Sequence, residues 1–282
     1  MLSVVRFFTI PEGGSGGFMR EFDVEGTKRF LVASLADEIK ARGFKKGVVG
    51  VSGGLDSSVV VTLLSLSLGK KNAIGVIMPY DVTREEDTRD ATEVLESLGV
   101  RSYRIDISPM VDDYFKNFPT ADKVRRGNKM ARERMSVLYD ISALENALVI
   151  GTGNKTEYNL GYSTLFGDAA CAIAPIGDLY KTEVRKLASH MGVLEKIIKK
   201  VPTAGLWKGQ TDEGELGYTY DEIDKLLYYI IDLQYPKKKL LHMDFDLEFI
   251  EDIFLRINDT EFKRKPPHIM KIPKRVKYVH KY

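Results

Sequence analysis

The sequence predicts an α/β protein built on a doubly wound parallel sheet that is flanked by helices. Short apolar runs at Val48–Val49, Ala73–Met78 and Val100–Ile107 alternate with segments of helical periodicity. Parallel strands need long crossovers of this kind, so three strands separated by helices favour a parallel sheet. A glycine-rich turn, Gly50–Ser57, directly follows the first run. Ligands of such sheets bind at the carboxyl ends of the strands, where we expect this turn.

The first helices are predicted from periodicity and from glycine stops. Apolar residues recur at helical spacing between Val24 and Arg42, and Gly43 ends that helix. A second helix is expected from the glycine-rich turn to Leu68. We expect the strand Ala73–Met78 to be fully buried, because it is a continuous apolar run that stops at a proline.

A third helix is predicted before the third strand. Thr83 and Glu86 have the spacing of a capping box at its start, and Gly99 ends it. Its inner face is expected to contain four apolar residues: Ala91, Val94, Leu95 and Leu98.

The second half of the chain adds one strand and several helices. We interpret residues 109–127 as a mobile loop or a short helical piece, followed by a helix from Asn128 to Leu144 and a fourth strand, Ala147–Ile150. Another helix is predicted from Thr182 to Met191. Residues 202–217 show little periodicity, and a segment of that length is usually functional or disordered. Two amphipathic helices follow, marked by Ile223, Leu226, Leu227, Ile230 and Ile231, and by Ile250, Ile253, Phe254 and Ile257.

Composition describes an ordinary soluble protein. The 282 residues are 44% hydrophobic and 29% charged, with a net charge of +2, so neither nucleic acid nor membrane is indicated as a partner. One cysteine, Cys171, fits a reducing cytoplasm, and residues 1–10 make a poor signal peptide. Residues 11–17 are expected to form a flexible glycine-rich loop. We predict a single domain over 1–282, with a core at about 28–257 and a basic tail at 258–282.

The glycine-rich turn has the chemistry of a phosphate cradle. Gly53 and Gly54 allow close approach of the backbone, Ser52 and Ser57 add hydroxyl groups, and Asp56 adds a carboxylate for a metal. No lysine stands where the Walker A loop requires one.

Ser52 to Ser57 matches the S-G-G-x-D-S pyrophosphate loop of the N-type ATP pyrophosphatases. The resemblance implies an adenine nucleotide alpha hydrolase-like fold and cleavage of ATP between its α and β phosphates. It also implies that the whole turn contacts ATP: Gly50, Val51, Ser52, Gly53, Gly54, Leu55, Asp56 and Ser57.

Stretches farther along the chain resemble the NAD synthetases in particular. They begin at Asn128, Gly151, Gly161, Lys200 and Phe262, and the resemblance spans roughly residues 28–267. On the ATP side it implies that Thr152, Lys181 and Thr203 contact ATP, that Asp56 and Lys181 are catalytic, and that Asp56 and Glu157 bind Mg²⁺. Considered alone, Glu157 also fits a first-turn helix acid that the helix dipole favours.

On the acceptor side the resemblance implies that Arg132, Lys263 and Asp168 contact deamido-NAD. An arginine suits a substrate that carries a pyrophosphate and a pyridine carboxylate. Three positions depart from the family: Leu165 and Ala172 replace a lysine and an aspartate that touch deamido-NAD in some members, and Phe262 replaces a histidine.

The resemblance implies a ligase that adenylates deamido-NAD with ATP and then forms NAD with ammonia, releasing AMP and pyrophosphate. Ammonia is expected because the chain has no glutamine-hydrolysing region, although a separate glutaminase subunit would also supply nitrogen. A homodimer is implied as well. The alternatives are another enzyme of the superfamily, such as a GMP synthetase subunit or a tRNA thiolase, and a nucleotide-binding module without catalysis. Intact Asp56, Glu157 and Lys181 argue against the last.

Overall fold

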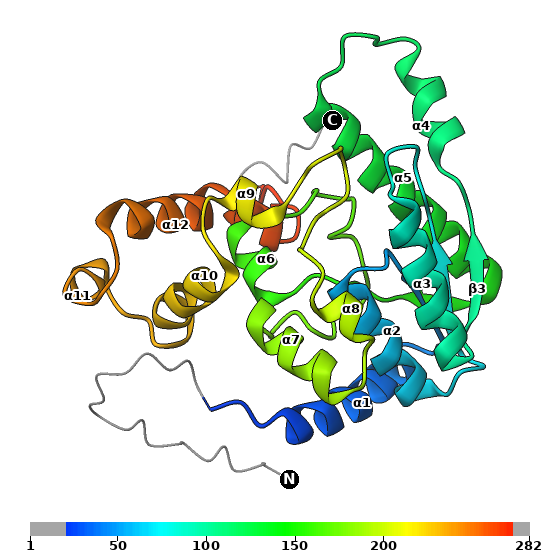
Figure 1. The fold of residues 1–282 in the computed structure, drawn as a ribbon, viewed down its shortest axis with the longest axis horizontal. Helices are drawn as coiled ribbons and strands as arrows, with labels where there is room; N and C mark the ends of the chain where they lie inside the picture. The colour runs from blue at the N-terminus through cyan, green and yellow to red at the C-terminus, as the bar shows by residue number, and fades with distance from the viewer. Residues whose placement is uncertain (1–20, 273–282) are drawn as a thin grey trace, which may run out of the picture.

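The sheet has four parallel strands, and its topology places the glycine-rich turn. The computed structural model describes residues 21–272, so the predicted loop at 11–17 and the end of the basic tail lie outside it. The strands are β1 (Lys46–Gly50), β2 (Ala73–Ile77), β3 (Arg101–Arg104) and β4 (Ala147–Val149), in the order β3-β2-β1-β4 (Figure 1). The chain runs outward from β1 to β3 and returns to the other side of β1, so the strand order reverses there.

Helices cover both faces of the sheet, as the doubly wound prediction requires. One face packs against α1 (Val24–Ala41), α2 (Leu55–Leu68), α3 (Glu85–Leu98) and α7 (Lys181–His190). The other packs against α4 (Ser108–Phe115) and α5 (Lys123–Glu145). Neighbouring residues of β1 point to opposite faces, so Val49 joins the first cluster and Val48 the second. Both are fully buried, which fixes β1 and the start of the turn after it.

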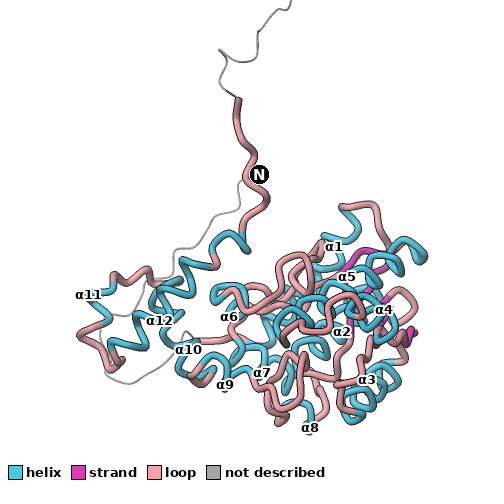
Figure 2. Tube along the Cα trace, turned by 90° about the horizontal axis from the view of Figure 1, so that it is seen from above, coloured by secondary structure: helices cyan, strands magenta, loops and turns pink. Residues whose placement is uncertain are grey.

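A third apolar cluster unites the later helices. It contains residues of α6 (Lys155–Leu160), α10 (Tyr220–Leu227) and α12 (Leu247–Asp259). The shorter helices near it or between the larger elements are α8 (Glu195–Ile198), α9 (Asp212–Leu216) and α11 (Lys237–Leu240), with single turns at Tyr228–Asp232 and Glu261–Arg264. Two views show α10, α11 and α12 at the end of the molecule opposite α3 and α4 (Figures 1 and 2). Within the described residues, no helix combines the length and apolar character needed to cross a membrane.

Most predicted elements are present, but the capping box predicted at Thr83 and Glu86 is wrong. Helix α3 begins at Glu85, and no side chain caps it. The Thr83 hydroxyl instead accepts a hydrogen bond from the Tyr80 N–H at 2.9 Å, in the turn that follows β2. The third strand is also shorter than predicted. Residues 109–127 contain most of α4 and the start of α5, so the helical alternative for that segment is the correct one.

Candidate active site

The glycine-rich turn joins β1 to α2 and presents backbone donors at the helix start. Gly53 has φ of +77°, and a Cβ there would lie 2.1 Å from the Asp87 carbonyl oxygen on α3. A side chain is therefore excluded by both conformation and space. The Ser52 N–H donates to Ser57 Oγ at 3.2 Å, and the Gly54 N–H donates to Ser52 Oγ at 3.3 Å. Donors collected at a helix N-terminus form a binding site for an anion.

Lys181, at the start of α7, supplies the positive charge that the turn lacks. Its ammonium lies 2.5 Å from Asp56 Oδ2 and 3.4 Å from Glu157 Oε1, and 5.1 Å from the centre of the Tyr220 ring. Only 3% of Lys181 is exposed. Burial alone would lower the pKa of Lys181, but Asp56 and Glu157 outweigh it, so the pKa is raised and the side chain remains charged.

Asn154 connects the two predicted metal ligands. It caps α6 by accepting from the Glu157 N–H at 3.0 Å, while Glu157 Oε2 accepts from the Asn154 N–H at 3.2 Å. The Asn154 amide also donates to Asp56 Oδ1 at 3.1 Å. Glu157 is thus a capping acid and a neighbour of Lys181 at once. Burial raises the pKa of Glu157, and Lys181 opposes that shift.

A third acid lies beside this group and was not predicted. Asp212, at the start of α9, accepts hydrogen bonds from the hydroxyls of Tyr220 at 3.0 Å and Tyr162 at 3.2 Å. Burial raises the pKa of Asp212, and the charge of Lys181 opposes the shift. The sequence resemblance includes this stretch without giving Asp212 a role, and only the fold shows that it faces Lys181.

A buried network also holds α6, α7 and α10 together. The Lys181 N–H donates to Thr156 Oγ1 at 3.0 Å, and that hydroxyl donates to Asp224 Oδ1 at 2.5 Å. Asp224 Oδ2 accepts from the Thr182 N–H at 2.8 Å. Burial raises the pKa of Asp224 to about 6. These bonds fix the first turn of α7 and hence the position of the Lys181 side chain.

The two remaining predicted ATP contacts lie at the edges of this region. Thr152 follows β4, on the same carboxyl edge of the sheet as the glycine-rich turn. Thr203 lies at the start of the segment 202–217, where its hydroxyl accepts from the Gly205 N–H at 3.1 Å. That segment begins beside the glycine-rich turn, because Lys200 bonds to the Gly53 carbonyl.

The three predicted deamido-NAD residues meet at one loop. Lys263 donates to the Gly161 and Ser163 carbonyls at 2.7 and 2.8 Å. Arg132 Nε donates to the Leu165 carbonyl at 3.3 Å, and the Thr164 N–H donates to Asp168 Oδ1 at 2.7 Å. Residues 132, 168 and 263 are far apart in sequence, but all three therefore meet at the loop 161–168.

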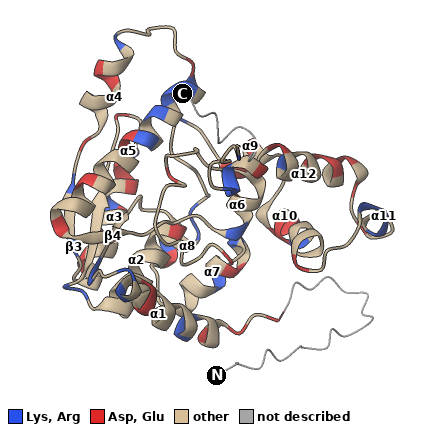
Figure 3. Cartoon of the chain, turned by 180° about the vertical axis from the view of Figure 1, so that it is seen from behind, with Lys and Arg blue, Asp and Glu red and all other residues tan. Residues whose placement is uncertain are grey.

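The surroundings of this loop are basic. Burial lowers the pKa of Lys263, and it lowers the pKa of Arg134 to about 10. Asp168 is exposed. The first half of α5 contains a run of cations, shown in Figure 3: Lys123, Arg125, Arg126, Lys129, Arg132 and Arg134. Among the positions that depart from the family, Leu165 is half-buried, whereas Ala172 and Phe262 are exposed.

The parallel sheet carries an S-G-G-x-D-S turn at the point where its strand order reverses, and a buried lysine and two acids lie beside that turn. These features define a nucleotide-cleaving enzyme of the N-type ATP pyrophosphatase class. Comparison with known proteins gives the family. The NAD synthase family profile matches residues 28–267, and the chain belongs to that family.

The relatives agree with this assignment. An NH3-dependent NAD(+) synthetase of Trichlorobacter lovleyi is 49% identical over 87% of this chain and 90% of its own. Among solved structures, an NMN synthetase from Francisella tularensis aligns with a TM-score of 0.79 at 33% identity, covering 89% of this chain and all of its own. An NH3-dependent NAD synthetase from Campylobacter jejuni, with the same two coverages, aligns at 0.77 and 34% identity. The predicted family, fold class and enzyme class, an ammonia-dependent NAD synthetase, are confirmed.

Proposed function

We propose that the chain forms NAD from deamido-NAD and ammonia, with ATP cleaved to AMP and pyrophosphate. ATP is the co-substrate of the family. The observation that carries the proposal is the group of Asp56, Lys181 and Glu157 beside the glycine-rich turn. Backbone donors at a helix start and a buried ammonium suit the departure of pyrophosphate, because negative charge develops there in the transition state.

In the proposed reaction, the pyridine carboxylate of deamido-NAD attacks the α-phosphorus of ATP, and pyrophosphate leaves. Ammonia then attacks the carbonyl of the acyl-adenylate, loses a proton, and displaces AMP. No side chain of the enzyme becomes covalently attached, because adenylation itself activates the carboxylate. The enzyme contributes position and charge: Lys181 and the turn at the pyrophosphate, and Arg132, Asp168 and Lys263 at the acceptor.

A Mg²⁺ ion fits the donor set that Asp56 and Glu157 provide. Both carboxylates direct an oxygen toward the same ammonium, so two hard oxygen ligands converge. Across residues 21–272, no cluster of three or more His, Cys, Asp or Glu suits a metal. Magnesium usually takes one or two carboxylates and completes its octahedron with phosphate and water. When bound, it would neutralise charge on the phosphates.

A second acceptor is nicotinate mononucleotide, which lacks the AMP half of deamido-NAD. The NMN synthetase of Francisella tularensis aligns well with this fold. Leu165 and Ala172 also remove two polar side chains that some family members direct at deamido-NAD. We expect deamido-NAD to be preferred, because the basic half of α5 and the loop 161–168 suit a longer anionic substrate.

One assay tests these proposals. Purified enzyme is supplied with ATP, Mg²⁺, ammonium and either acceptor, and NAD, NMN and pyrophosphate are quantified. We expect NAD with stoichiometric pyrophosphate. Absence of NAD would contradict the main proposal, and faster NMN formation would favour the mononucleotide. Replacing ammonium with glutamine alone tests the nitrogen donor, and we expect no NAD, because the glutamine amide must be hydrolysed before its nitrogen can attack the acyl-adenylate.

Three further expectations remain proposals: the homodimer that the resemblance implies, and the cytoplasmic location and single domain over 1–282 that the sequence indicates. Sedimentation of the full chain tests the first, and the expected result is twice the mass of 31.8 kDa. We also propose that the segments 109–127 and 202–217 close over the bound substrates and exclude water. Protection of both segments from proteolysis when ATP and acceptor are added is the expected result.

A further inference from the structure

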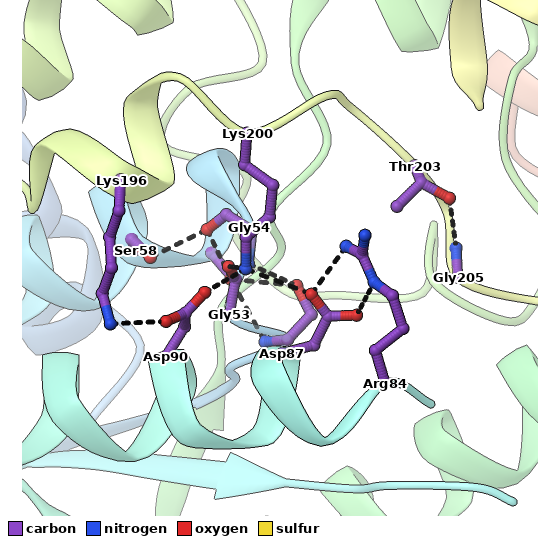
Figure 4. Close-up of polar contacts among 12 residues, drawn as sticks. Gly53, Gly54, Ser58, Arg84, Asp87, Asp90, Lys196, Lys200, Thr203 and Gly205 are labelled. Atoms are coloured by element: carbon purple, nitrogen blue, oxygen red, sulfur yellow. Dashed lines mark hydrogen bonds and ion pairs between the residues drawn. The ribbon is translucent and has the colours of Figure 1, made fainter. Parts of the chain in front are cut away.

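Behind the glycine-rich turn, Lys200 holds the carbonyl of Gly53 (Figure 4). Its ammonium donates to the Gly53 carbonyl oxygen at 3.2 Å and to Asp87 Oδ1 at 3.1 Å, and it also bonds to Asp90 Oδ2. A lysine ammonium has three donors, so these three acceptors satisfy it completely. The Lys200 side chain is only 11% exposed.

Both acids belong to α3, the helix against which Gly53 packs. A Cβ at Gly53 would collide with the backbone of Asp87, so turn and helix are in direct contact. Arg84 bonds to both carboxylate oxygens of Asp87, at 2.9 and 2.8 Å. The position of Asp87 is therefore fixed from its other side, and Lys200 is held by a rigid partner.

Asp90 is held in the same way. Lys196 lies 2.7 Å from Asp90 Oδ1, while Lys200 binds the other oxygen. Burial would raise the pKa of Asp90, but the hydrogen bonds from Lys196 and Lys200 outweigh it, and the pKa is lowered. Lys196 makes no contact with the glycine-rich turn, although it shares Asp90 with Lys200 (Figure 4).

The bond from Lys200 determines the orientation of the peptide between Gly53 and Gly54. In a planar trans peptide the carbonyl and the next N–H point in opposite directions. Because the Gly53 carbonyl faces Lys200, the Gly54 N–H faces the inside of the turn, where it donates to Ser52 Oγ. Two successive glycines permit the flipped peptide as well. The flipped form would turn a carbonyl oxygen toward the anion and remove a donor.

We propose that Lys200 is a positioning residue that fixes the Gly53–Gly54 peptide so that the Gly54 N–H stays on the inside of the turn, beside Ser52, where the pyrophosphate is proposed to bind. Lys200 also precedes the segment 202–217, whose Pro202 carbonyl accepts from the Asp212 N–H at 3.0 Å. The same side chain thus ties the base of that segment to the turn. This inference deepens the proposed function and rests on it for the identity of the anion.

The test compares Lys200→Met with Lys196→Met in the full-length protein. Calorimetric titration with inorganic pyrophosphate and Mg²⁺ gives Kd, steady-state kinetics give KM for ATP and for the acceptor, and thermal melting gives stability. Loss of a hydrogen bond from a charged group corresponds to about tenfold in affinity. For Lys200→Met we expect a roughly tenfold rise in the pyrophosphate Kd and in the ATP KM, with the acceptor KM within about twofold of wild type. Lys196→Met should leave all three within about twofold, because it removes a bond to Asp90 but none to the turn.

The outcomes separate this inference from the proposed function. An unchanged pyrophosphate Kd in Lys200→Met overturns the proposed positioning role of Lys200. An equal rise of the pyrophosphate Kd in Lys196→Met also overturns it, because that result would show a general effect on α3. If Lys200→Met does not fold, Lys200→Arg replaces it. The arginine keeps the charge but not the compact geometry, and a Kd rise of at least about threefold is expected. Wild-type protein that binds pyrophosphate but makes no NAD contradicts the proposed function alone. Wild-type protein that does not bind pyrophosphate overturns the proposed positioning role of Lys200.

Discussion

Removal of the Lys181 charge tests whether the buried ion group is as tightly coupled as its geometry indicates. Lys181→Met keeps a side chain of similar length and leaves Asp56 and Glu157 as neighbouring carboxylates without a cation. Breaking a buried ion pair by removing one partner typically costs about 3–5 kcal/mol, because the remaining charge is uncompensated. The 2.5 Å contact with Asp56 and the 3% exposure of Lys181 place this variant within that range. We expect loss of turnover together with a large loss of stability.

A double-mutant cycle isolates the Lys181–Asp56 pair. Asp56→Asn removes the acid charge at nearly constant shape, so the double variant has no uncompensated charge from this pair. Its free energy of unfolding in urea, followed by circular dichroism, should exceed the additive value by about 2 kcal/mol. Lys46→Met serves as the control cation, because Lys46 pairs with Glu145 at 3.0 Å at the other end of β1. Its effect should add to that of Asp56→Asn within about 0.5 kcal/mol. Additivity in the Lys181 cycle as well would refute the coupling.

Three other predictions follow from single contacts. The pKa of Asp224 is raised to about 6 from 3.8, so the folded state is favoured when this carboxyl is protonated. Its contribution to stability is present at low pH and falls by about 3 kcal/mol as the pH rises from about 4 to 6. In urea unfolding, Asp224→Asn should lack this fall, and identical pH profiles of the variant and the wild type would contradict the prediction. Gly53→Ala should unfold at lower urea concentration than the wild type and bind pyrophosphate poorly. Gly43→Ala is the control, because Gly43 has φ of +82° but open space around it, and this variant should lose only about 1 kcal/mol in the free energy of unfolding. Equal losses in the two variants would show that the clash of the added Cβ at position 53 with α3 is relieved. Asn154→Asp keeps the helix cap but places a buried carboxylate against Asp56, so it should slow turnover with ATP by about tenfold and also lower the melting temperature. Normal turnover would contradict the role of the amide.

The fold was largely predictable, because its main signals are local in sequence. The buried strands are continuous apolar runs, α3 is capped by the predicted glycine, Gly99, and α1 ends at Ala41, two residues before the predicted Gly43. The capping box failed for a local reason too. The same hydroxyl has two possible partners, and at Thr83 the turn N–H of Tyr80 takes it. Sequence spacing alone does not distinguish these two arrangements.

The candidate site was predictable only in part, because its charges come from distant segments. The glycine-rich turn and Asp56 have a local pattern, whereas the position of Lys181 beside them came from family resemblance. Asp212 and Lys200 have no local pattern that reports their contacts, which exist only after α3 and α7 pack on the sheet. Asn154 and Glu157 do show N-cap spacing, and that signal predicts the cap but not the bond to Asp56.

Helix α6 connects the two ends of the proposed reaction. Its six residues extend over about 9 Å, with Glu157 in the first turn and the Gly161 carbonyl just past the last. Arg264 donates to carbonyls of Tyr158 and Asn159 at the end of α6, and Lys263 donates to that of Gly161. Cations at a helix C-terminus are stabilising, so these two residues hold the helix from the acceptor side while the Asn154 cap holds it from the ATP side. A helix held at both ends keeps a constant separation between Glu157, the proposed metal ligand, and the loop 161–168. That separation is what adenylation requires, because the acceptor carboxylate must reach the α-phosphorus while the pyrophosphate remains in the glycine-rich turn.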